Sequence, residues 1–162
     1  MMNKKIIGIV TGILLLGGLV WLAAPSGDGQ VAPTEEANYD FGSISMAAGK
    51  VKHTFSVRNE SDETITIGKM YTSCMCTTAT LVIGSPSTGS GSRRFGPYGM
   101  PGHGFISAIG EELAPGEKAT VEAVFDPAAH GPAGIGRVQR TIVIENSRGE
   151  PLQLSFTAEV TP

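Results

Sequence analysis

The sequence lacks the motifs that mark most enzyme active sites. It contains no G-x-S-x-G, no H-E-x-x-H, no G-x-x-x-x-G-K-[ST] and no C-x-x-C pattern. The glycine-rich run at 131–136 has no lysine where a phosphate loop requires one and no strand-turn-helix unit around it, so it indicates a turn. We therefore expect no catalytic residues, and a protein that is not an enzyme.

Basic residues are scarce in the greater part of the chain. Beyond residue 24 the sequence has 10 Lys and Arg against 15 Asp and Glu, a net charge of −5, and only Arg93 and Arg94 stand next to each other. A surface that binds nucleic acid needs clustered Lys and Arg to neutralise phosphates. The composition therefore argues against a nucleic-acid partner.

The one long apolar run lies at the N-terminus. Residues 6–24 (IIGIVTGILLLGGLVWLAA) carry no charge and are close to the ~20 residues that span a bilayer as a helix. Lys4 and Lys5 precede the run and Asp28 follows it, so the positive-inside rule places the rest of the chain outside the cytoplasm. We expect a transmembrane helix at 1–25 that stays as a single-pass anchor or, alternatively, a cleaved signal peptide. A polar linker at 26–37 would then join a periplasmic or extracellular domain to the cell membrane.

From residue 38 onward no stretch keeps a helical period for long. Short segments rich in Val, Ile, Thr and Phe alternate instead with clusters of Gly, Asn, Asp and Pro, which is typical of β-strands joined by turns. The seven expected strands cover 39–44, 51–58, 64–71, 80–83, 119–125, 137–145 and 152–160. This pattern predicts an all-β fold, an immunoglobulin-like β-sandwich domain at 38–162.

Residues 84–112 interrupt this rhythm with a long run rich in Gly, Ser and Pro. A loop of this length in a small domain is uncommon and is either functional or disordered. Its second half contains the aromatic residues Phe95, Tyr98 and Phe105. We expect an inserted loop whose aromatic residues bind a protein partner in the cell envelope.

The two cysteines of the chain are separated by one residue, in Cys74-Met75-Cys76. On a regular strand the Cα atoms of residues i and i+2 are about 6.6 Å apart, at the far end of the range that a disulfide accepts. A disulfide here would need a bent backbone, and it would behave as a labile redox switch. Alternatively the two sulfurs bind a soft metal ion, or both cysteines are small apolar core residues. All three interpretations stay open.

A metal site would need more ligands, because two cysteines do not complete a tetrahedral structural zinc site. Met100 and His103, spaced M-x-x-H in the long loop, are the candidate ligands that we place beside the two cysteines, and the combined set suits copper, or zinc. A histidine on the apolar face of a strand, such as His53, is more often a core residue, and we expect His130 to be exposed in a turn. Further candidates by residue type are Met70, Met75, His53 and His130.

Several motifs, taken in order, resemble a known family. They are Tyr39-Asp40-Phe41-Gly42, Thr54-Phe55, Ser73-Cys74-Met75-Cys76-Thr77 and Leu113-Ala114-Pro115-Gly116-Glu117. Over residues 38–160 they resemble the bacterial family called domain of unknown function 1573. The resemblance implies an immunoglobulin-like sandwich related to the Hydin-type (ASH) and major sperm protein domains. It implies no activity, since the family consists mostly of exported proteins of uncharacterised role.

The chain departs from this family at two places. The family usually shows Ser-Cys-Gly-Cys-Thr, so Met75 stands where glycine is expected. Methionine resists the bend that glycine permits, and we expect a more strand-like backbone at this point. The family also passes quickly from the cysteine motif to the Pro-Gly turn, so the insertion at 84–112 is particular to this chain.

Taken together, the sequence favours a membrane-tethered, extracytoplasmic binding or scaffolding module without catalytic activity. One alternative is a copper-binding or copper-handling protein that uses Cys74, Cys76, Met100 and His103. The other is a thiol redox sensor built on the cysteine pair.

Overall fold

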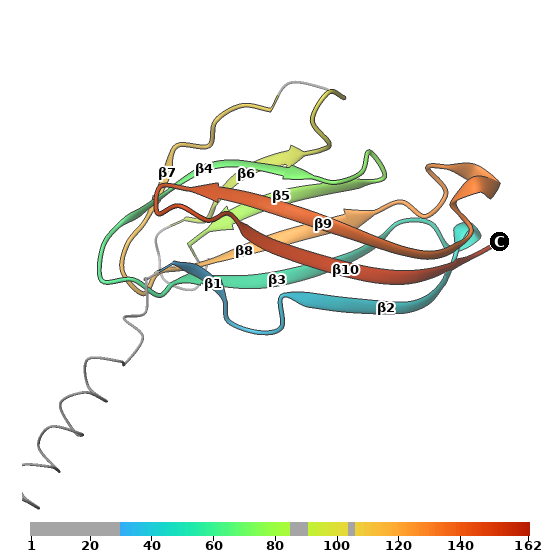
Figure 1. Cartoon of the computed structure of the whole chain (residues 1–162), viewed down its shortest axis with the longest axis horizontal. Helices are drawn as coiled ribbons and strands as arrows, with labels where there is room; N and C mark the ends of the chain where they lie inside the picture. Colours follow the sequence, from blue (N-terminus) through green and yellow to red (C-terminus); the bar gives the residue numbers. More distant parts are fainter. Residues whose placement is uncertain (1–29, 85–90, 104–105) are drawn as a thin grey trace, which may run out of the picture.

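The computed structural model describes residues 30–84, 91–103 and 106–162. This part of the chain is all-β, as predicted: ten strands form two five-stranded sheets, with two short 3-10 helices and no α-helix (Figure 1). The predicted membrane segment at 1–25 lies outside the described residues. Among the residues that are described, no helix has the length and apolar character needed to cross a membrane.

The two sheets differ in strand order. The first has the order β1-β3-β8-β5-β6 and consists of β1 (Val31–Pro33), β3 (Val51–Asn59), β5 (Thr77–Ile83), β6 (Arg93–Tyr98) and β8 (Lys118–Phe125). The second has the order β2-β10-β9-β4-β7 and consists of β2 (Asn38–Ser45), β4 (Ile65–Thr72), β7 (Glu111–Leu113), β9 (Gly136–Asn146) and β10 (Leu152–Thr161). The two 3-10 helices are η1 (Met46–Ala48) and η3 (Gly131–Gly134). Neighbouring strands are antiparallel, except that β2 runs parallel to β10.

All seven strands predicted from the period-two alternation are present. In β8 the alternate residues Ala119, Val121, Ala123 and Phe125 are buried, whereas the residues between them keep some exposure. Ile65 and Ile67 of β4 are likewise buried on one face. Each sheet therefore has one apolar face, and packing these faces together removes both from water.

The expected number of about seven strands is too low, because three further strands carry no apolar alternation. β1 and β7 have only three residues each, and β6 (RRFGPY) contains Gly and Pro, which are depleted in strands. β1 lies in the range expected as linker, and β6 and β7 lie in the range expected as a loop. Each extends a sheet by pairing with an edge strand, β3, β5 or β4, so the neighbour's hydrogen bonds determine its conformation.

The buried side chains between the sheets form two clusters. The larger one contains fully buried residues of both sheets, including Val57, Ile65, Leu81 and Ile142. The smaller one consists of Cys76, Phe125, Phe156, Ala158 and Val160, with partly buried residues such as Cys74 packed against it. One cysteine is thus a core residue, and its neighbour lies at the margin of the core.

Three connections between the sheets lie at the same end of the molecule, which we call the crossover end. They are residues 46–50, 73–76 and 126–135, and each joins a strand of one sheet to a strand of the other. Antiparallel pairing places Thr77, the first residue of β5, opposite Phe125, the last residue of β8. The cysteine turn therefore lies beside the loop that follows β8, more than fifty residues later in the sequence.

His53 lies on the apolar face of β3, as its strand pattern predicts, but it is half-buried and belongs to neither core cluster. Its ring stacks on Tyr39 with 3.7 Å between ring centroids, and it meets Phe55 edge to face at 4.6 Å. Tyr39 belongs to the second sheet and His53 to the first, so the stack closes one side of the sandwich. These aromatic neighbours partly remove the imidazole from water, which disfavours its charged form.

The stability of the domain is expected to fall in mild acid because of His53. Burial lowers the pKa of His53 below its ordinary value of 6.5, and the nearby Glu35 opposes this effect only in part. The unfolded state then binds a proton more readily than the folded state, so the free energy of unfolding decreases as the pH falls below about 6.5. Urea unfolding on either side of that pH measures the effect. The His53→Phe variant, which keeps a ring in the stack, should lose this component, and an identical pH dependence in both proteins would contradict it.

Candidate functional site

The cysteine motif forms a tight turn between β4 and β5. The Thr77 N–H donates to the Cys74 carbonyl at 3.1 Å, and the Cα atoms of Cys74 and Cys76 are 5.3 Å apart. The two sulfurs are joined in a disulfide. The expectation of a more strand-like backbone at Met75 was wrong, because the chain crosses between the sheets here and has to bend. That bend brings the Cα atoms within the range in which a disulfide forms.

Hydrogen bonds hold this turn from several directions. The Thr72 hydroxyl lies 3.0 Å from the carbonyl oxygens of both Cys74 and Thr77. The Ser73 N–H donates to the Thr141 carbonyl, and the Thr141 N–H donates to the Ser73 hydroxyl, each at 2.9 Å. These bonds tie the turn to β9 and fix the position of the disulfide. They also indicate a structural role for Ser73, the first residue of the Ser73-Cys74-Met75-Cys76-Thr77 motif.

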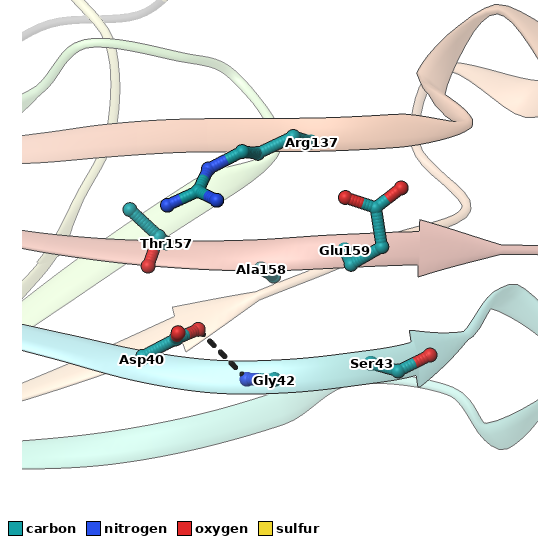
Figure 2. Close-up of a pocket in the computed structure, with 7 residues that line it drawn as sticks. All are labelled: Asp40, Gly42, Ser43, Arg137, Thr157, Ala158 and Glu159. Carbon is teal, nitrogen blue, oxygen red and sulfur yellow. Dashed lines mark hydrogen bonds between the residues drawn. The ribbon is translucent and has the colours of Figure 1, made fainter.

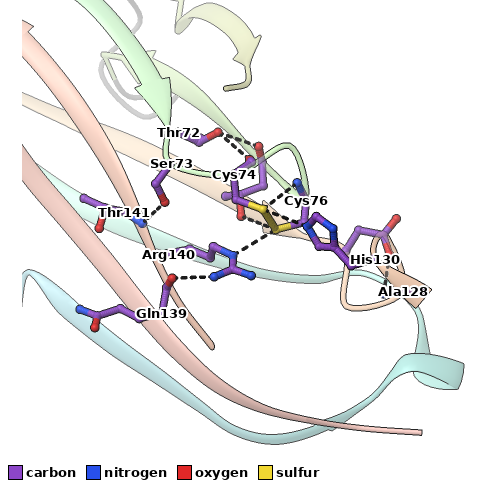
Figure 3. The surroundings of a disulfide bond; sticks show 11 residues. Thr72, Ser73, Cys74, Cys76, Ala128, His130, Gln139, Arg140 and Thr141 are labelled. Atoms are coloured by element: carbon purple, nitrogen blue, oxygen red, sulfur yellow. Dashed lines mark hydrogen bonds between the residues drawn. A yellow bond between two sulfur atoms is a disulfide. The ribbon is translucent and has the colours of Figure 1, made fainter. Parts of the chain in front are cut away.

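Two nitrogen-bearing side chains flank the disulfide, one at each sulfur (Figure 3). The Arg140 Nε–H of β9 donates to Cys76 Sγ at 3.1 Å, and His130 Nε2 lies 3.2 Å from Cys74 Sγ. Cys76 is only 3% exposed and Cys74 is half-buried. Cys74 is therefore the more exposed of the two residues, and the more enclosed residue, Cys76, receives the guanidinium.

The Arg140 guanidinium is the main positive charge at this site. Burial lowers the pKa of Arg140, yet a guanidinium keeps its charge at any physiological pH. Its Nη1 donates to the Gln139 carbonyl at 2.8 Å, and in residues 30–84, 91–103 and 106–162 no carboxylate forms an ion pair with it. Because no carboxylate compensates this charge, it stabilises a negative charge on the adjacent sulfur.

The arrangement also has the composition of a metal site. The ligand atoms of Cys74, Cys76 and His130 all lie within 4.8 Å of one another. Within the part of the chain that the structure describes, the group contains no fourth His, Cys, Asp or Glu. Thiolate and imidazole ligands favour Cu(I) and Zn(II) over magnesium or calcium.

The predicted ligands Met100 and His103 occupy a separate turn. The His103 N–H donates to the Met100 carbonyl at 3.2 Å, and the His103 side chain is exposed. The turn is connected to β4 through the Thr72 N–H, which donates to the Gly99 carbonyl at 3.0 Å. His103 is not part of the compact ligand group described above. A role for Met100 and His103 in metal binding stays a prediction.

His130, which the sequence offered only as a further candidate by residue type, is the histidine that the structure brings to the cysteines. It is exposed in a turn, as expected, but the turn lies against Cys74. No sequence spacing could connect His130 with the cysteines, because their proximity results from the pairing of β5 with β8. The proximity could have been inferred only from the fact that the cysteine turn and the loop containing His130 both connect one sheet to the other.

The aromatic residues expected to bind a partner are partly used in the fold. Tyr98 is 9% exposed and belongs to the larger core cluster, and Phe95 is a half-buried residue packed against the same cluster. Phe105 lies outside the described residues. Partner binding by these three residues stays a prediction.

A shallow hollow of about 150 Å³ lies between β2, β10 and β9. It is lined by Asp40, Gly42, Ser43, Arg137, Thr157, Ala158 and Glu159 (Figure 2). The register of β2 against β10 shifts here, Gly42 has a positive φ of 67°, and its N–H donates to Asp40 Oδ1 at 2.8 Å. The hollow therefore marks a β-bulge, and the Tyr39-Asp40-Phe41-Gly42 motif has a structural role in forming it.

Residues 33–89 match the family described as protein of unknown function DUF1573. This range contains the β2 motif and the cysteine turn, so the resemblance predicted from these motifs is confirmed; the Leu113-Ala114-Pro115-Gly116-Glu117 motif lies beyond the matched residues. No curated protein matches the sequence.

Solved structures with a similar fold have very different sequences. A protein of unknown function from Porphyromonas gingivalis W83 has a TM-score of 0.54 and 14% identity over 85% of this chain and 50% of its own. The secreted serine protease VesC from Vibrio cholerae gives 0.49 and 12%, over 88% of this chain and 25% of its own. The ASH/PapD-like domain 7 of human CEP192 gives 0.46 and 12%, over 84% of this chain and 89% of its own. The chain thus spans half or less of the first two proteins, and at these identities the similarity concerns the fold alone.

Proposed function

We propose that this protein, whose domain is similar to DUF1573, is an extracytoplasmic thiol redox module. In this proposal the Cys74–Cys76 disulfide exchanges with external thiols. The proposal rests on one observation, the placement of the disulfide between Arg140 and His130 in a turn held by hydrogen bonds. Both cysteines of the chain are used in this bond. The module changes its own oxidation state and needs no catalytic turnover.

The unequal exposure of the two cysteine residues gives the exchange a direction. An external thiolate attacks the accessible Cys74 Sγ, a mixed disulfide forms there, and the bond to Cys76 breaks. The electron pair of that bond leaves on Cys76 Sγ as a thiolate beside the Arg140 guanidinium. A second external thiolate then attacks the mixed disulfide and releases an external disulfide. Two external thiols are oxidised, and the cysteine pair is reduced.

The location and partners follow from the same proposal. The apolar run at 6–24, preceded by Lys4 and Lys5, supports a tether in the cell membrane with the domain on the outer side. Disulfides persist in such compartments. An immunoglobulin-like sandwich held near the membrane would present the crossover end to a partner protein of the envelope, and the oxidation state of the turn would modulate that binding.

Trapping of a mixed disulfide tests the proposal. The full chain is purified in detergent as Cys76→Ser and as Cys74→Ser, and each variant is exposed to an excess of a low-molecular-weight disulfide. The Cys74 thiol of the first variant should form a stable adduct roughly ten times faster than the buried Cys76 thiol of the second, measured by intact mass. A faster reaction at Cys76, or no reaction at either cysteine in the folded protein, would refute the mechanism.

Removal of the guanidinium should slow reduction of the wild-type disulfide. Arg140→Met keeps much of the side-chain volume but takes the positive charge away from the leaving Cys76 sulfur. Reduction by a dithiol should become slower by about tenfold, which corresponds to about 1.4 kcal/mol of lost stabilisation. Arg137→Met, on the exposed face of the same strand, is the matched control and should react at the wild-type rate. Equal rates in both variants would exclude a role for Arg140.

A further inference from the structure

We propose that the reduced site binds one Cu(I) ion through Cys74, Cys76 and His130. This inference rests on the proposed function in one respect, since the cysteine pair must first be reduced. The ligand set differs from the one that the sequence suggested, because His130 takes the place of Met100 and His103. The oxidised protein, whose sulfurs are joined, has no thiolate to offer and should bind no Cu(I).

The positions of the three ligand atoms fit a shared ion. All three lie within 4.8 Å of one another, and His130 Nε2 is 3.2 Å from Cys74 Sγ. With metal–sulfur bonds near 2.3 Å and metal–nitrogen bonds near 2.0 Å, atoms that share an ion lie roughly 3.5 to 4 Å apart. When the disulfide opens, the two sulfurs separate toward this distance while the turn keeps both on the same side.

The backbone around His130 is already ordered for ligation. The Gly131 N–H donates to the Ala128 carbonyl at 2.9 Å, and the Ala128 N–H donates to Asp126 Oδ1 at 3.0 Å. Gly134 leaves room for His130, because a Cβ at that position would lie 3.2 Å from the His130 Cβ. The backbone that carries His130 is therefore ordered before any ion binds, which reduces the entropy lost on binding.

The number and type of ligands favour Cu(I) over Zn(II). The two thiolates are soft donors that select Cu(I), and imidazole also binds copper, so three such ligands suit a three-coordinate Cu(I) ion. A structural zinc site needs four ligands, and among the described residues the group has no fourth His, Cys, Asp or Glu. Zinc would have to complete its shell with water, at a site where one sulfur belongs to a residue that is 3% exposed.

The charge of the site fits as well. A Cu(I) ion with two thiolates has a net charge of minus one, and Arg140 Nε lies 3.1 Å from Cys76 Sγ to offset it. The balance of the reaction is simple. A dithiol reductant supplies two electrons and two protons to the disulfide, and Cu(I) then displaces both thiol protons without changing its own oxidation state.

Competition with a chromogenic Cu(I) chelator tests the inference. The full chain in detergent is reduced, freed of reductant without oxygen and titrated with Cu(I) alone, with Zn(II) alone in a parallel series. We expect one Cu(I) per chain, roughly tenfold or greater loss of affinity in His130→Ala, and loss of binding in Cys74→Ser. His103→Ala is the matched control, because its histidine is also exposed in a turn, and it should bind as the wild type does.

Several outcomes would overturn the inference. Reduced protein that binds no more Cu(I) than oxidised protein excludes the site. Unchanged affinity in His130→Ala with a loss in His103→Ala would assign the third ligand to the other loop. Tighter binding of Zn(II) than of Cu(I) would refute the choice of metal. Mixed-disulfide trapping is measured without metal. A failure of Cu(I) binding therefore leaves the redox proposal intact, and a failure of the redox proposal is detected by the trapping experiment alone.

Discussion

Replacement of Phe156 by alanine is expected to lower the free energy of unfolding by about 3 to 5 kcal/mol. Phe156 of β10 is fully buried in the smaller core cluster. Its ring lies 5.3 Å from the rings of both Phe41 and Phe125, measured between centroids. Alanine would remove these contacts and leave a cavity between two sheets that cannot close around it without disturbing several strands.

Urea unfolding of the full chain in detergent measures this loss. Ile135→Ala is the control, because Ile135 is 47% exposed and its truncation should cost no more than about 0.5 kcal/mol. Equal destabilisation by the two variants would contradict the assignment of Phe156 to the core. The cluster also contains Cys76, so Phe156→Ala should make the buried thiol of a Cys74→Ser background more reactive.

Replacement of Asn59 by leucine should cost about 3 kcal/mol, although leucine has a similar volume and is apolar. Asn59 is fully buried, and its Nδ2 donates to the carbonyls of Glu63 and Leu113, each at 2.8 Å. Its Oδ1 accepts from the N–H and the hydroxyl of Ser61 at 2.9 and 2.7 Å. Leucine would remove the side-chain partner of the Leu113 carbonyl and of the Ser61 N–H, and it would release the end of β3 from the strand β7 that completes the second sheet.

Asn146 provides the matched control for this change. Its side chain makes comparable bonds at a strand end, from Nδ2 to the Glu150 carbonyl at 3.1 Å and from the Arg148 N–H to Oδ1 at 2.8 Å. These bonds are exposed, so water replaces them in Asn146→Leu and the expected loss is about 1 kcal/mol or less. If both variants lost equal stability in urea, burial would not be the cause.

The two proposals describe one site in two oxidation states. When oxidised, the sulfurs of Cys74 and Cys76 are bonded to each other and are closed to metal. When reduced, they are thiols between a guanidinium and an imidazole, available either to an external disulfide or to a soft cation. Metal binding and disulfide formation would therefore exclude each other, and Cu(I) should protect the reduced protein from oxidation.

The strands that carry most of the fold follow directly from local sequence. In β8 every second residue is apolar, and in β3 Val51, Phe55 and Val57 follow the same period, which places these side chains on one face of each strand. The same local reasoning placed His53 on the apolar face, where the structure stacks it on Tyr39. The fold class could be predicted because the alternation of apolar and polar side chains over a few neighbouring residues indicates that one face of the sheet is buried.

The residue pattern alone could not predict where β6 pairs or how the cysteine turn bends. β6 contains Gly and Pro and is a strand because β5 presents an edge to it. The bend at Met75 arises because the chain passes from one sheet to the other, and this overrides the resistance of a methionine to bending. In both cases the conformation depends on distant partners that a short window of sequence does not contain.

By itself, the sequence determined the all-β class, the positions of seven strands and the presence of a cysteine pair that could form a disulfide or bind a metal ion. Tertiary structure alone decided what surrounds that pair. His130 and Arg140 are far from the cysteines along the chain, and only the pairing of β5 with β8 and of β4 with β9 brings them to the two sulfurs. The physical reason is that side-chain periodicity is a local property, whereas a site between two sheets is assembled by contacts of long sequence separation.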